Sequence, residues 1–149
     1  MPSRKPLQLE EFLPYRLSLL SNTVSGAIAA AYRDKFNIDM PEWRLMMVLA
    51  EYPGSSAEEV CRRTRMEKSV VSRAVARLLE RHLLTRKVDT NDRRRSILEL
   101  TRTGVSVYDE VTPVATDYTR RLLAGLTADE KSLLDRLLRK LQAGAEVLA

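Results

Sequence analysis

The residues of this chain with the most specific chemistry are three consecutive arginines, Arg93, Arg94 and Arg95, at the end of the segment DTNDRRR. A guanidinium is planar and always charged, and it suits bidentate binding of phosphate or carboxylate oxygens. Because adjacent guanidiniums repel one another, three of them together need negative charge nearby. The flanking runs LLTRKV and SILEL are rich in apolar and β-branched residues, which predicts a β-hairpin with the arginines on its projecting tip.

The basic charge of the chain is concentrated around this hairpin. From Arg62 to Arg102 there are 13 Lys and Arg residues against 5 Asp and Glu, whereas the rest of the chain has 12 against 15. The net charge of +5 is therefore local. A basic segment between near-neutral or acidic ones favours a docking surface for a polyanion such as nucleic acid, although a solvated charged surface stays open on this count alone.

The stretch EKSVVSRAVARLLERHLL, which precedes the hairpin, predicts a helix that is apolar on one side and basic on the others. Serine hydroxyls suit base edges or phosphates, and Arg73 can form two hydrogen bonds with a guanine. Val70 suits a thymine methyl group or, equally, the packing of the helix, while Arg77 and Arg86 are better placed as phosphate contacts. The predicted DNA-binding residues of this helix and the strand after it are Lys68, Ser69, Val70, Ser72, Arg73, Arg77 and Arg86.

Other chemistry finds little support in the composition. The single histidine, His82, leaves no cluster for a zinc site, and the single cysteine, Cys61, excludes an internal disulfide. The five glycines form no phosphate-binding pattern, so we expect no catalytic residues, no metal, no cofactor and no enzyme. We expect Cys61 to be a buried, inert thiol, with a redox-responsive thiol as the alternative, and His82 to end its helix.

No membrane partner is expected either. No apolar run approaches the roughly 18 residues that span a bilayer. The first twelve residues, MPSRKPLQLEEF, also lack the apolar stretch of a secretory signal, so we expect a cytoplasmic protein.

Helices are predicted on both sides of the basic segment. Pro14 and Pro41 lie near the starts of two of them, because proline is favoured in the first helical turn. Ser56 and Thr127 each precede a Glu by three residues, the pattern of a capping box, which predicts two further helix starts. Pro113 lies inside a helical pattern, where we expect a bend and not a stop.

The helices near both ends of the chain carry more apolar surface than a small domain can cover. Two copies of the chain would bury this excess, so we expect a homodimer with an interface built from residues 9–36 and 103–148. The apolar residues concerned are Leu13, Leu17, Leu20, Val24, Ala27 and Ala31 in the first helix and Leu133, Leu134, Leu137, Leu138 and Leu141 in the last.

The order of elements from residue 41 to 101 is helix, short helix, break, basic-faced helix and hairpin, which is that of a winged helix-turn-helix. The expected fold is therefore mainly α with a small β-hairpin: a winged helix-turn-helix at 41–101 flanked by N- and C-terminal dimerisation helices. With these elements the chain resembles the MarR (multiple antibiotic resistance regulator) family over nearly its full length, as a single MarR-like domain of residues 1–149. The resemblance rests on PEWRLMMVLAEYPGSSAEEV, SVVSRAVARLLERHLLTRKVDTNDRRRSILELTRTG and LLAGLTADEKSLLDRLLRKL. Its most specific part is an Asp-x-Arg wing followed by Leu-Thr-x-x-Gly at Leu100 to Gly104.

The resemblance implies a role for the hairpin tip. In the family the arginine of the Asp-x-Arg element enters a minor groove and the aspartate holds it, and these positions match Arg94 and Asp92. A narrow minor groove is strongly negative and suits an inserted arginine. Arg93 and Arg95 are predicted to contact the flanking phosphates. The implied protein is a homodimeric, sequence-specific DNA-binding transcriptional regulator, more often a repressor than an activator, that binds an inverted repeat in double-stranded DNA.

The resemblance also implies a small-molecule effector, often an aromatic acid, in a crevice between the dimerisation helices and the winged domain. Arg16, with Tyr15 beside it, borders the apolar stripe of the first helix and is predicted to bind the acid group; an internal ion pair with an acidic residue is the alternative. Trp43 and Met47 are predicted to form the apolar wall of the same site. An architectural DNA-binding protein without a ligand stays open as another function.

Overall fold

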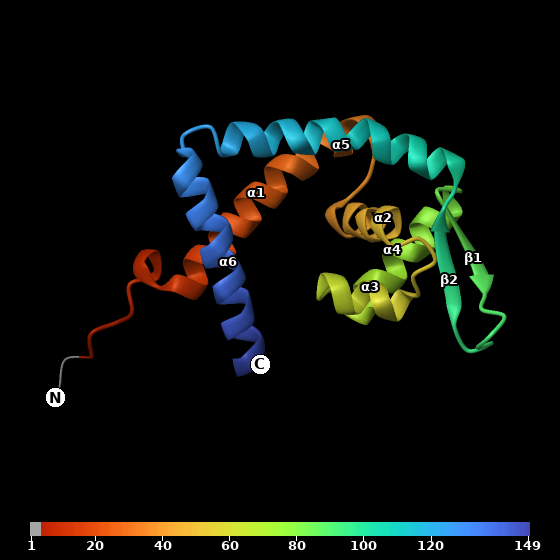
Figure 1. Ribbon diagram of the computed structural model, residues 1–149, viewed down its shortest axis with the longest axis horizontal. Coiled ribbons are helices and arrows are strands. Elements are labelled where there is room, and N and C mark those ends of the chain that lie inside the picture. Colours follow the sequence, from red (N-terminus) through yellow and green to blue (C-terminus); the bar gives the residue numbers. More distant parts are fainter. Residues whose placement is uncertain (1–3) are drawn as a thin grey trace. The chain divides into compact units, whose positions relative to one another are not determined.

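The computed structural model describes residues 4–149, and its regular elements are helices and one β-hairpin (Figure 1). The fold class expected from the sequence is confirmed. Residues 1–3 of the predicted single domain lie outside the described residues. The chain forms two compact units, Met1–Val114 and Ala115–Ala149. The elements are the 3-10 helix η1 (Leu9–Glu11), α1 (Leu13–Phe36), α2 (Met40–Glu51), α3 (Ala57–Thr64), α4 (Lys68–Glu80), β1 (Leu84–Val88), β2 (Ser96–Leu100), α5 (Arg102–Leu122) and α6 (Ala128–Leu148).

The core of the first unit lies between α2, α3, α4 and the hairpin. The face of α4 that was predicted to be apolar is buried, and it packs against α2 and α3. Each fully buried aliphatic side chain of this kind stabilises the fold by about 1.5–3 kcal/mol relative to an exposed one. The core side chains of these elements are Trp43, Leu45, Met46, Val48, Leu49, Val60, Val71, Ala74, Val75, Leu78, Leu84 and Leu98.

Local signals in the sequence set the starts and ends of these helices. At α3 the predicted capping box is present: Glu59 N donates to Ser56 Oγ at 3.2 Å, and Ser56 N donates to Glu59 Oε2 at 3.4 Å. The predicted break after α3 falls at Arg65, whose φ of 60° is left-handed and turns the chain into α4. Glu67 precedes α4 and makes no side-chain cap, so the first N–H groups of α4 have no such partner.

The hairpin is an antiparallel pair whose register runs from Leu84 opposite Leu100 to Val88 opposite Ser96. The segment before α3 pairs with β2 through one antiparallel bridge between Ser55 and Leu98. In this bridge Leu98 N donates to Ser55 O at 3.0 Å, and Gly54 N donates to Leu98 O at 3.2 Å. Gly54 has a φ of 82°, a backbone conformation that residues with a Cβ rarely adopt. The hairpin is therefore held to the helical core along β2.

The Leu-Thr-x-x-Gly segment forms the junction between the hairpin and α5. Thr101 N donates to Leu83 O at 3.0 Å, and Thr101 Oγ1 donates to His82 O at 2.7 Å. The same hydroxyl oxygen accepts from Gly104 N at 2.9 Å, which caps the start of α5. Gly104 is buried, and a Cβ built on it would lie 2.1 Å from Leu83 O. The motif thus consists of a cap and a residue that must lack a side chain.

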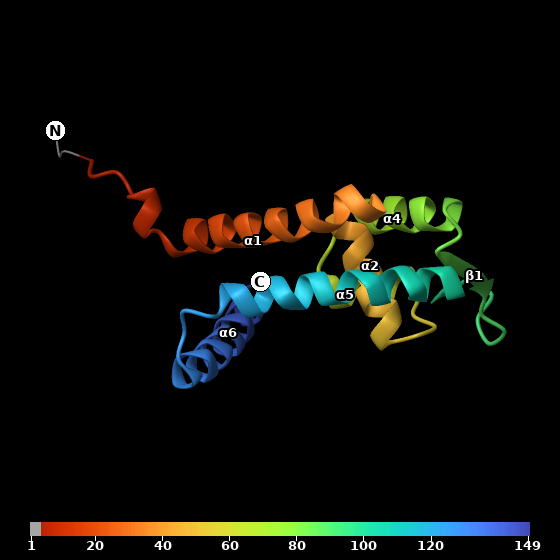
Figure 2. The same ribbon diagram turned by 90° about the horizontal axis from the view of Figure 1, so that it is seen from above.

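Only the last turns of α1 join the core of the first unit. Ala29 and Tyr32 are buried, whereas Leu13, Leu17 and Leu20 of the predicted stripe are 49, 42 and 59% exposed. Figure 2 shows the first part of α1 away from α2 and α4, which lie beside its last turns. Among the described residues, this leucine-containing part of the stripe is therefore left exposed.

The second unit contains the end of α5 and all of α6. α5 continues through Pro113, as expected, so the proline does not end the helix. The capping box predicted at α6 is present, with Glu130 N donating to Thr127 Oγ1 at 3.1 Å. The predicted leucine band of α6, from Leu133 to Leu141, is 37–51% exposed in the single chain.

Candidate nucleic-acid interface

The exposed face of α4 carries most of the predicted DNA-binding residues. Packing of the opposite face against α2 and α3 leaves Lys68, Ser69, Ser72 and Arg73 exposed, while Val70 is half-buried. Ser69 and Arg73 are four residues apart, so they lie one above the other on the helix surface, about 6 Å apart. Hydroxyls and a guanidinium on one exposed face can reach base edges and phosphates together.

The hairpin tip presents two of its three arginines to solvent. Asp92 Oδ1 accepts from the backbone N–H of Arg94 at 3.0 Å, and Arg95 N donates to Asp92 O at 3.0 Å. Asp92 therefore fixes the backbone of the turn, and the Arg93 and Arg94 side chains are left exposed. Arg86 on β1 is exposed as well. The resemblance implies that the aspartate holds the arginine, and here the contact of the Asp92 side chain with Arg94 is made to the backbone N–H of Arg94.

The third tip arginine faces inward. The guanidinium of Arg95 forms an ion pair with Glu59 Oε1, and Arg95 is only half-exposed. Glu59 is also the carboxylate of the α3 capping box, so one side chain joins the start of α3 to the tip of the hairpin. The predicted contact between Arg95 and DNA phosphates would have to compete with this pair.

Arg77, the other predicted phosphate contact on α4, is also paired within the chain. Its Nη1 lies 2.7 Å from Asp39 Oδ2 and 3.7 Å from Glu42 Oε1. Asp39 caps α2 at the same time, because its Oδ1 accepts from Glu42 N at 2.9 Å. One turn later on α4, Arg81 donates to Phe36 O at 2.7 Å and to Asn37 O at 2.9 Å. These carbonyls end α1, where a cation is favourable.

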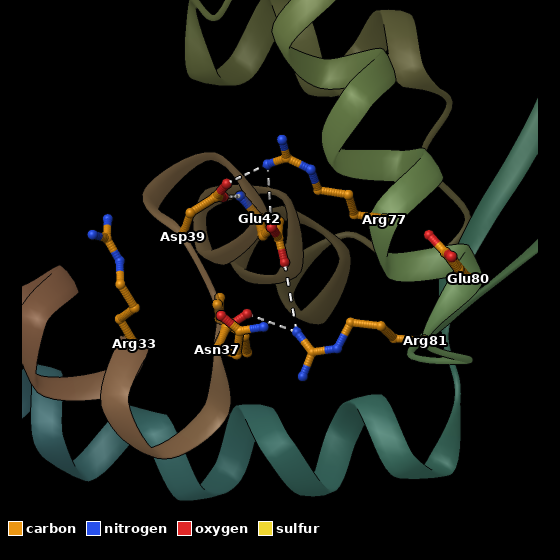
Figure 3. A pocket seen from close by; sticks show the side chains of 8 residues that line it. Arg33, Asn37, Asp39, Glu42, Arg77, Glu80 and Arg81 are labelled. Carbon is orange, nitrogen blue, oxygen red and sulfur yellow. Dashed lines mark hydrogen bonds and ion pairs between the residues drawn. The ribbon is translucent and has the colours of Figure 1, made fainter.

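Asp39, Glu42, Arg77 and Arg81 line one pocket of about 270 Å³ at the junction of α1, α2 and α4 (Figure 3). Glu42 is 4% exposed, and its Oε2 has no hydrogen-bond partner. Burial, together with the nearby charge of Asp39 and a hydrogen bond to it, raises the pKa of Glu42 to about 7, against the opposing effect of the two arginines. Sequence reasoning missed this site, although Asp39 stands three residues before Glu42 in a helix-capping pattern.

The structure does not bring the predicted ligand-binding residues together within one chain. Trp43 is buried and stacks on Tyr108, with ring centroids 5.2 Å apart, and its centroid is 5.7 Å from that of Tyr32. Arg16 stands sixteen residues before Tyr32 on α1, which is about 24 Å along a helix axis. Tyr15 is exposed beside Arg16, and Met47 is exposed on α2. Arg16 and Trp43 can hold one small ligand only if they belong to different protomers.

Cys61 and His82 have structural surroundings. Cys61 is half-buried, so the expectation of a buried thiol is met only in part, and it lines a pocket of about 420 Å³ between α3 and α4. His82 follows α4 with a φ of 57°, and its N–H donates to Leu79 O at 3.0 Å. It ends the helix through its backbone, as expected. Among the described residues, no helix is both long enough and apolar enough to cross a membrane.

Comparison with known protein families and sequences relates this geometry to DNA-binding regulators. Residues 36–95, which include the whole of α2 to β1, match the family model described as MarR family. The chain is 30% identical over 96 residues to the HTH-type transcriptional repressor NicR of Pseudomonas putida, a match that covers 64% of this chain and 61% of NicR. It is 27% identical over 105 residues to the transcriptional regulator HosA of Escherichia coli, covering 70% of this chain and 78% of HosA.

Solved structures are similar to this chain over a longer part of its length. A MarR/EmrR family transcriptional regulator from Acinetobacter sp. ADP1 is similar with a TM-score of 0.86 at 26% identity, covering 94% of this chain and 99% of that one. The PcaV transcriptional regulator from Streptomyces coelicolor, solved in complex with its natural ligand, has a TM-score of 0.78 at 25% identity. That comparison covers 95% of this chain and 99% of PcaV.

Proposed function

From the premise that this chain belongs to the MarR family, we propose that it is a homodimeric transcriptional regulator which a small molecule releases from an inverted-repeat operator. It acts as a repressor in the cytoplasm, where its DNA partner is. Residues 1–149 form one MarR-like domain, in which 41–101 bind DNA and 9–36 and 103–148 form the dimer.

The observation that carries the proposal is the exposed set of side chains on α4 and the hairpin tip. Lys68, Ser69, Ser72 and Arg73 lie on the exposed face of α4, and Arg94 projects from the tip with its backbone fixed by Asp92. An α-helix fits the major groove, and a hairpin arginine fits the minor groove beside it. We propose that α4 reads base pairs, that Arg94 enters the minor groove, and that Arg86 and Arg93 bind phosphates.

The uncovered apolar surfaces of α1 and α6 support the proposed dimer. Leu13, Leu17 and Leu20 on α1 and the leucine band of α6 are exposed in the single chain. Monomeric soluble proteins rarely expose contiguous apolar surface of this kind. A two-fold dimer would place two copies of α4 on one face of the duplex, about one helical turn or ~10 bp apart, which corresponds to an inverted repeat.

The proposed effector is a small molecule, and an aromatic acid is its proposed class. PcaV, similar in fold at 25% identity, was solved with its natural ligand. In this chain the proposed binding residues are Tyr15, Arg16, Trp43 and Met47, with the two residues of α1 supplied by the partner protomer. The guanidinium of Arg16 would bind the acid group and the side chains of α2 would contact the ring.

The experiment that tests the proposal is selection of DNA from a random-oligonucleotide pool with the purified protein, followed by footprinting on the recovered sequence. A regulator recovers one short inverted repeat and protects it in register. An architectural DNA-binding protein coats DNA without register, and that result would exclude the proposed function. The change Arg94→Ala should weaken binding and lower the salt dependence by about one phosphate contact or less. A variant with unchanged affinity at every salt concentration would exclude the proposed role of the hairpin tip.

A further inference from the structure

Four charged residues join α4 to the junction between α1 and α2. Arg77 forms its hydrogen bond with Asp39, at 2.7 Å, and Arg81 forms its hydrogen bonds with the carbonyls of Phe36 and Asn37. Glu42 lies beneath both guanidiniums, with its oxygens 3.7 and 3.8 Å from them. Figure 3 shows these side chains pointing toward one another, the arginines from α4, Glu42 from α2 and Asp39 from the residue before α2. We call Asp39, Glu42, Arg77 and Arg81 the α4 anchor.

The carboxyl group of Glu42 can change its charge without breaking the α4 anchor. The three hydrogen bonds of Arg77 and Arg81 all go to other acceptors, and the two contacts of Glu42 with the guanidiniums are longer than hydrogen bonds. A proton on Glu42 would also lower the free-energy cost of burying its unpartnered Oε2, because a neutral carboxyl group costs less to bury than a carboxylate. Protonation therefore removes a negative charge and leaves the helix contacts in place.

The position of the α4 anchor connects this charge to DNA binding. Ser69, Arg73 and Arg77 follow one another at intervals of four residues, so Arg77 continues the stripe that is proposed to face the duplex. The Cβ atoms of Arg77 and Arg73 are therefore about 6 Å apart, and Glu42 Oε1 lies 3.7 Å from Arg77 Nη1. A phosphate bound beside this stripe would act on the charge of Glu42 where it came within the Debye length, about 8 Å at physiological salt.

We propose that Glu42 takes up a proton when the protein binds DNA, so that the α4 anchor makes operator affinity dependent on pH. The inference rests on the proposed function and adds a regulatory property to it. Phosphates favour the neutral form of a carboxyl group near them, and by linkage the neutral form then favours DNA. DNA affinity falls as pH rises through the range in which Glu42 loses its proton, near pH 7. Arg77 is in this arrangement a positioning residue for α4.

Other charged groups around Glu42 must be considered as sources of the same effect. α1 contributes Arg33, α4 contributes Glu80 as well as its two arginines, and Asp39 comes from the loop before α2. Of these side chains, Figure 3 shows Arg33 and Glu80 without an interaction to the others. Among the described residues, no charged side chain of α3 or β2 lines this pocket. His82, just after α4, is a further titratable side chain in this part of the chain and needs its own control.

The test is a pH series of DNA affinity at fixed ionic strength, from pH 6 to pH 8, with a fluorescein-labelled duplex that carries the selected repeat. Each unit by which DNA raises the pKa of Glu42 appears as a tenfold change in affinity per protomer. We expect the wild type to bind about tenfold or more weakly at pH 8 than at pH 6. Glu42→Gln should keep the pH 6 affinity at pH 8.

Two control variants separate Glu42 from its neighbours. Glu80→Gln removes a charge from the same pocket and should change DNA affinity by the same factor at every pH. His82→Asn introduces a residue that tolerates a left-handed backbone and should leave the pH dependence of DNA affinity unchanged. Equal pH dependence in Glu42→Gln and wild type, or loss of the dependence in His82→Asn, would overturn the inference. A wild type that binds with pH-independent affinity would overturn this inference alone, whereas one that binds no duplex at any pH would overturn the proposed function with it.

Discussion

Replacing Gly104 by alanine should show how closely the hairpin and α5 are packed. The added Cβ would lie 2.1 Å from Leu83 O and 3.1 Å from Leu83 C, which is closer than any tolerated contact with backbone atoms. Leu83 O cannot move freely, because it accepts from Thr101 N at 3.0 Å. The backbone must therefore shift and weaken this hydrogen bond, or α5 must move away from the hairpin.

The expected loss of stability follows from three contributions. Forcing a methyl group into a packed site costs about 1–3 kcal/mol, and contact with a fixed carbonyl belongs at the upper end of that range. The weakened hydrogen bond adds about 1 kcal/mol. The better helix propensity of alanine offsets about 1 kcal/mol. We therefore expect Gly104→Ala to lower the free energy of unfolding by about 3 kcal/mol, a large part of the 5–15 kcal/mol typical of a domain.

Gly26→Ala is the matched control, because Gly26 lies within α1 and a Cβ there would meet nothing within 4 Å among the described residues of its own chain. This variant should gain about 0.5–1 kcal/mol. Urea unfolding of the three proteins at one fixed protein concentration measures both changes, since stability of a dimer depends on concentration. The reasoning is refuted if Gly104→Ala is as stable as the wild type or changes in the same direction as Gly26→Ala.

Three further outcomes are expected. Burial raises the pKa of Glu42 from 4.5 to about 7, so the charged form destabilises the fold and the free energy of unfolding falls as pH rises through this interval. In urea titrations, Glu42→Gln should therefore raise the free energy of unfolding by about 3 kcal/mol at pH 8 and by about 1 kcal/mol at pH 5. An equal gain at both pH values would contradict the raised pKa of Glu42. Arg77→Ala should weaken DNA binding without changing its dependence on salt concentration, whereas a slope reduced by about one would identify a direct phosphate contact. Sedimentation at micromolar concentration should give twice the chain mass of 17.0 kDa, and a folded monomer would exclude the proposed dimer.

The elements of this fold could be predicted because their signals are local in the sequence. The capping boxes at Ser56 and Thr127 act over three residues, and the buried face of α4 follows from its own periodicity. The partners of Arg77 and Arg95 could not be predicted in this way, because they stand 38 and 36 residues away and only tertiary packing brings them close. A basic residue on a helix or a hairpin looks the same in sequence whether it will meet a phosphate or a carboxylate of its own chain.

The sequence also could not predict which distant residues lie near Trp43, a predicted ligand-binding residue. Trp43 was predicted as one wall of a site that includes Arg16, but the length of α1 separates the two within a chain. Helical spacing identifies which residues share a face of one helix, and it carries no information about which end of a long helix approaches the core. The buried Glu42 was missed for a related reason, since a glutamate in the first turn of a helix usually remains in water.

The three attachments of the hairpin have a consequence for the entropy of DNA binding. β2 is joined to Ser55, Arg95 is paired with Glu59, and Thr101 is bonded to His82, so the strands are ordered before any partner arrives. A detached two-stranded hairpin would be only marginally stable in water and would lose its freedom on association. Here the side chains left to be immobilised at the tip are chiefly Arg93 and Arg94, each at about 0.5–1.5 kcal/mol. The hairpin is preorganised, and most of its conformational entropy is lost during folding and not during binding.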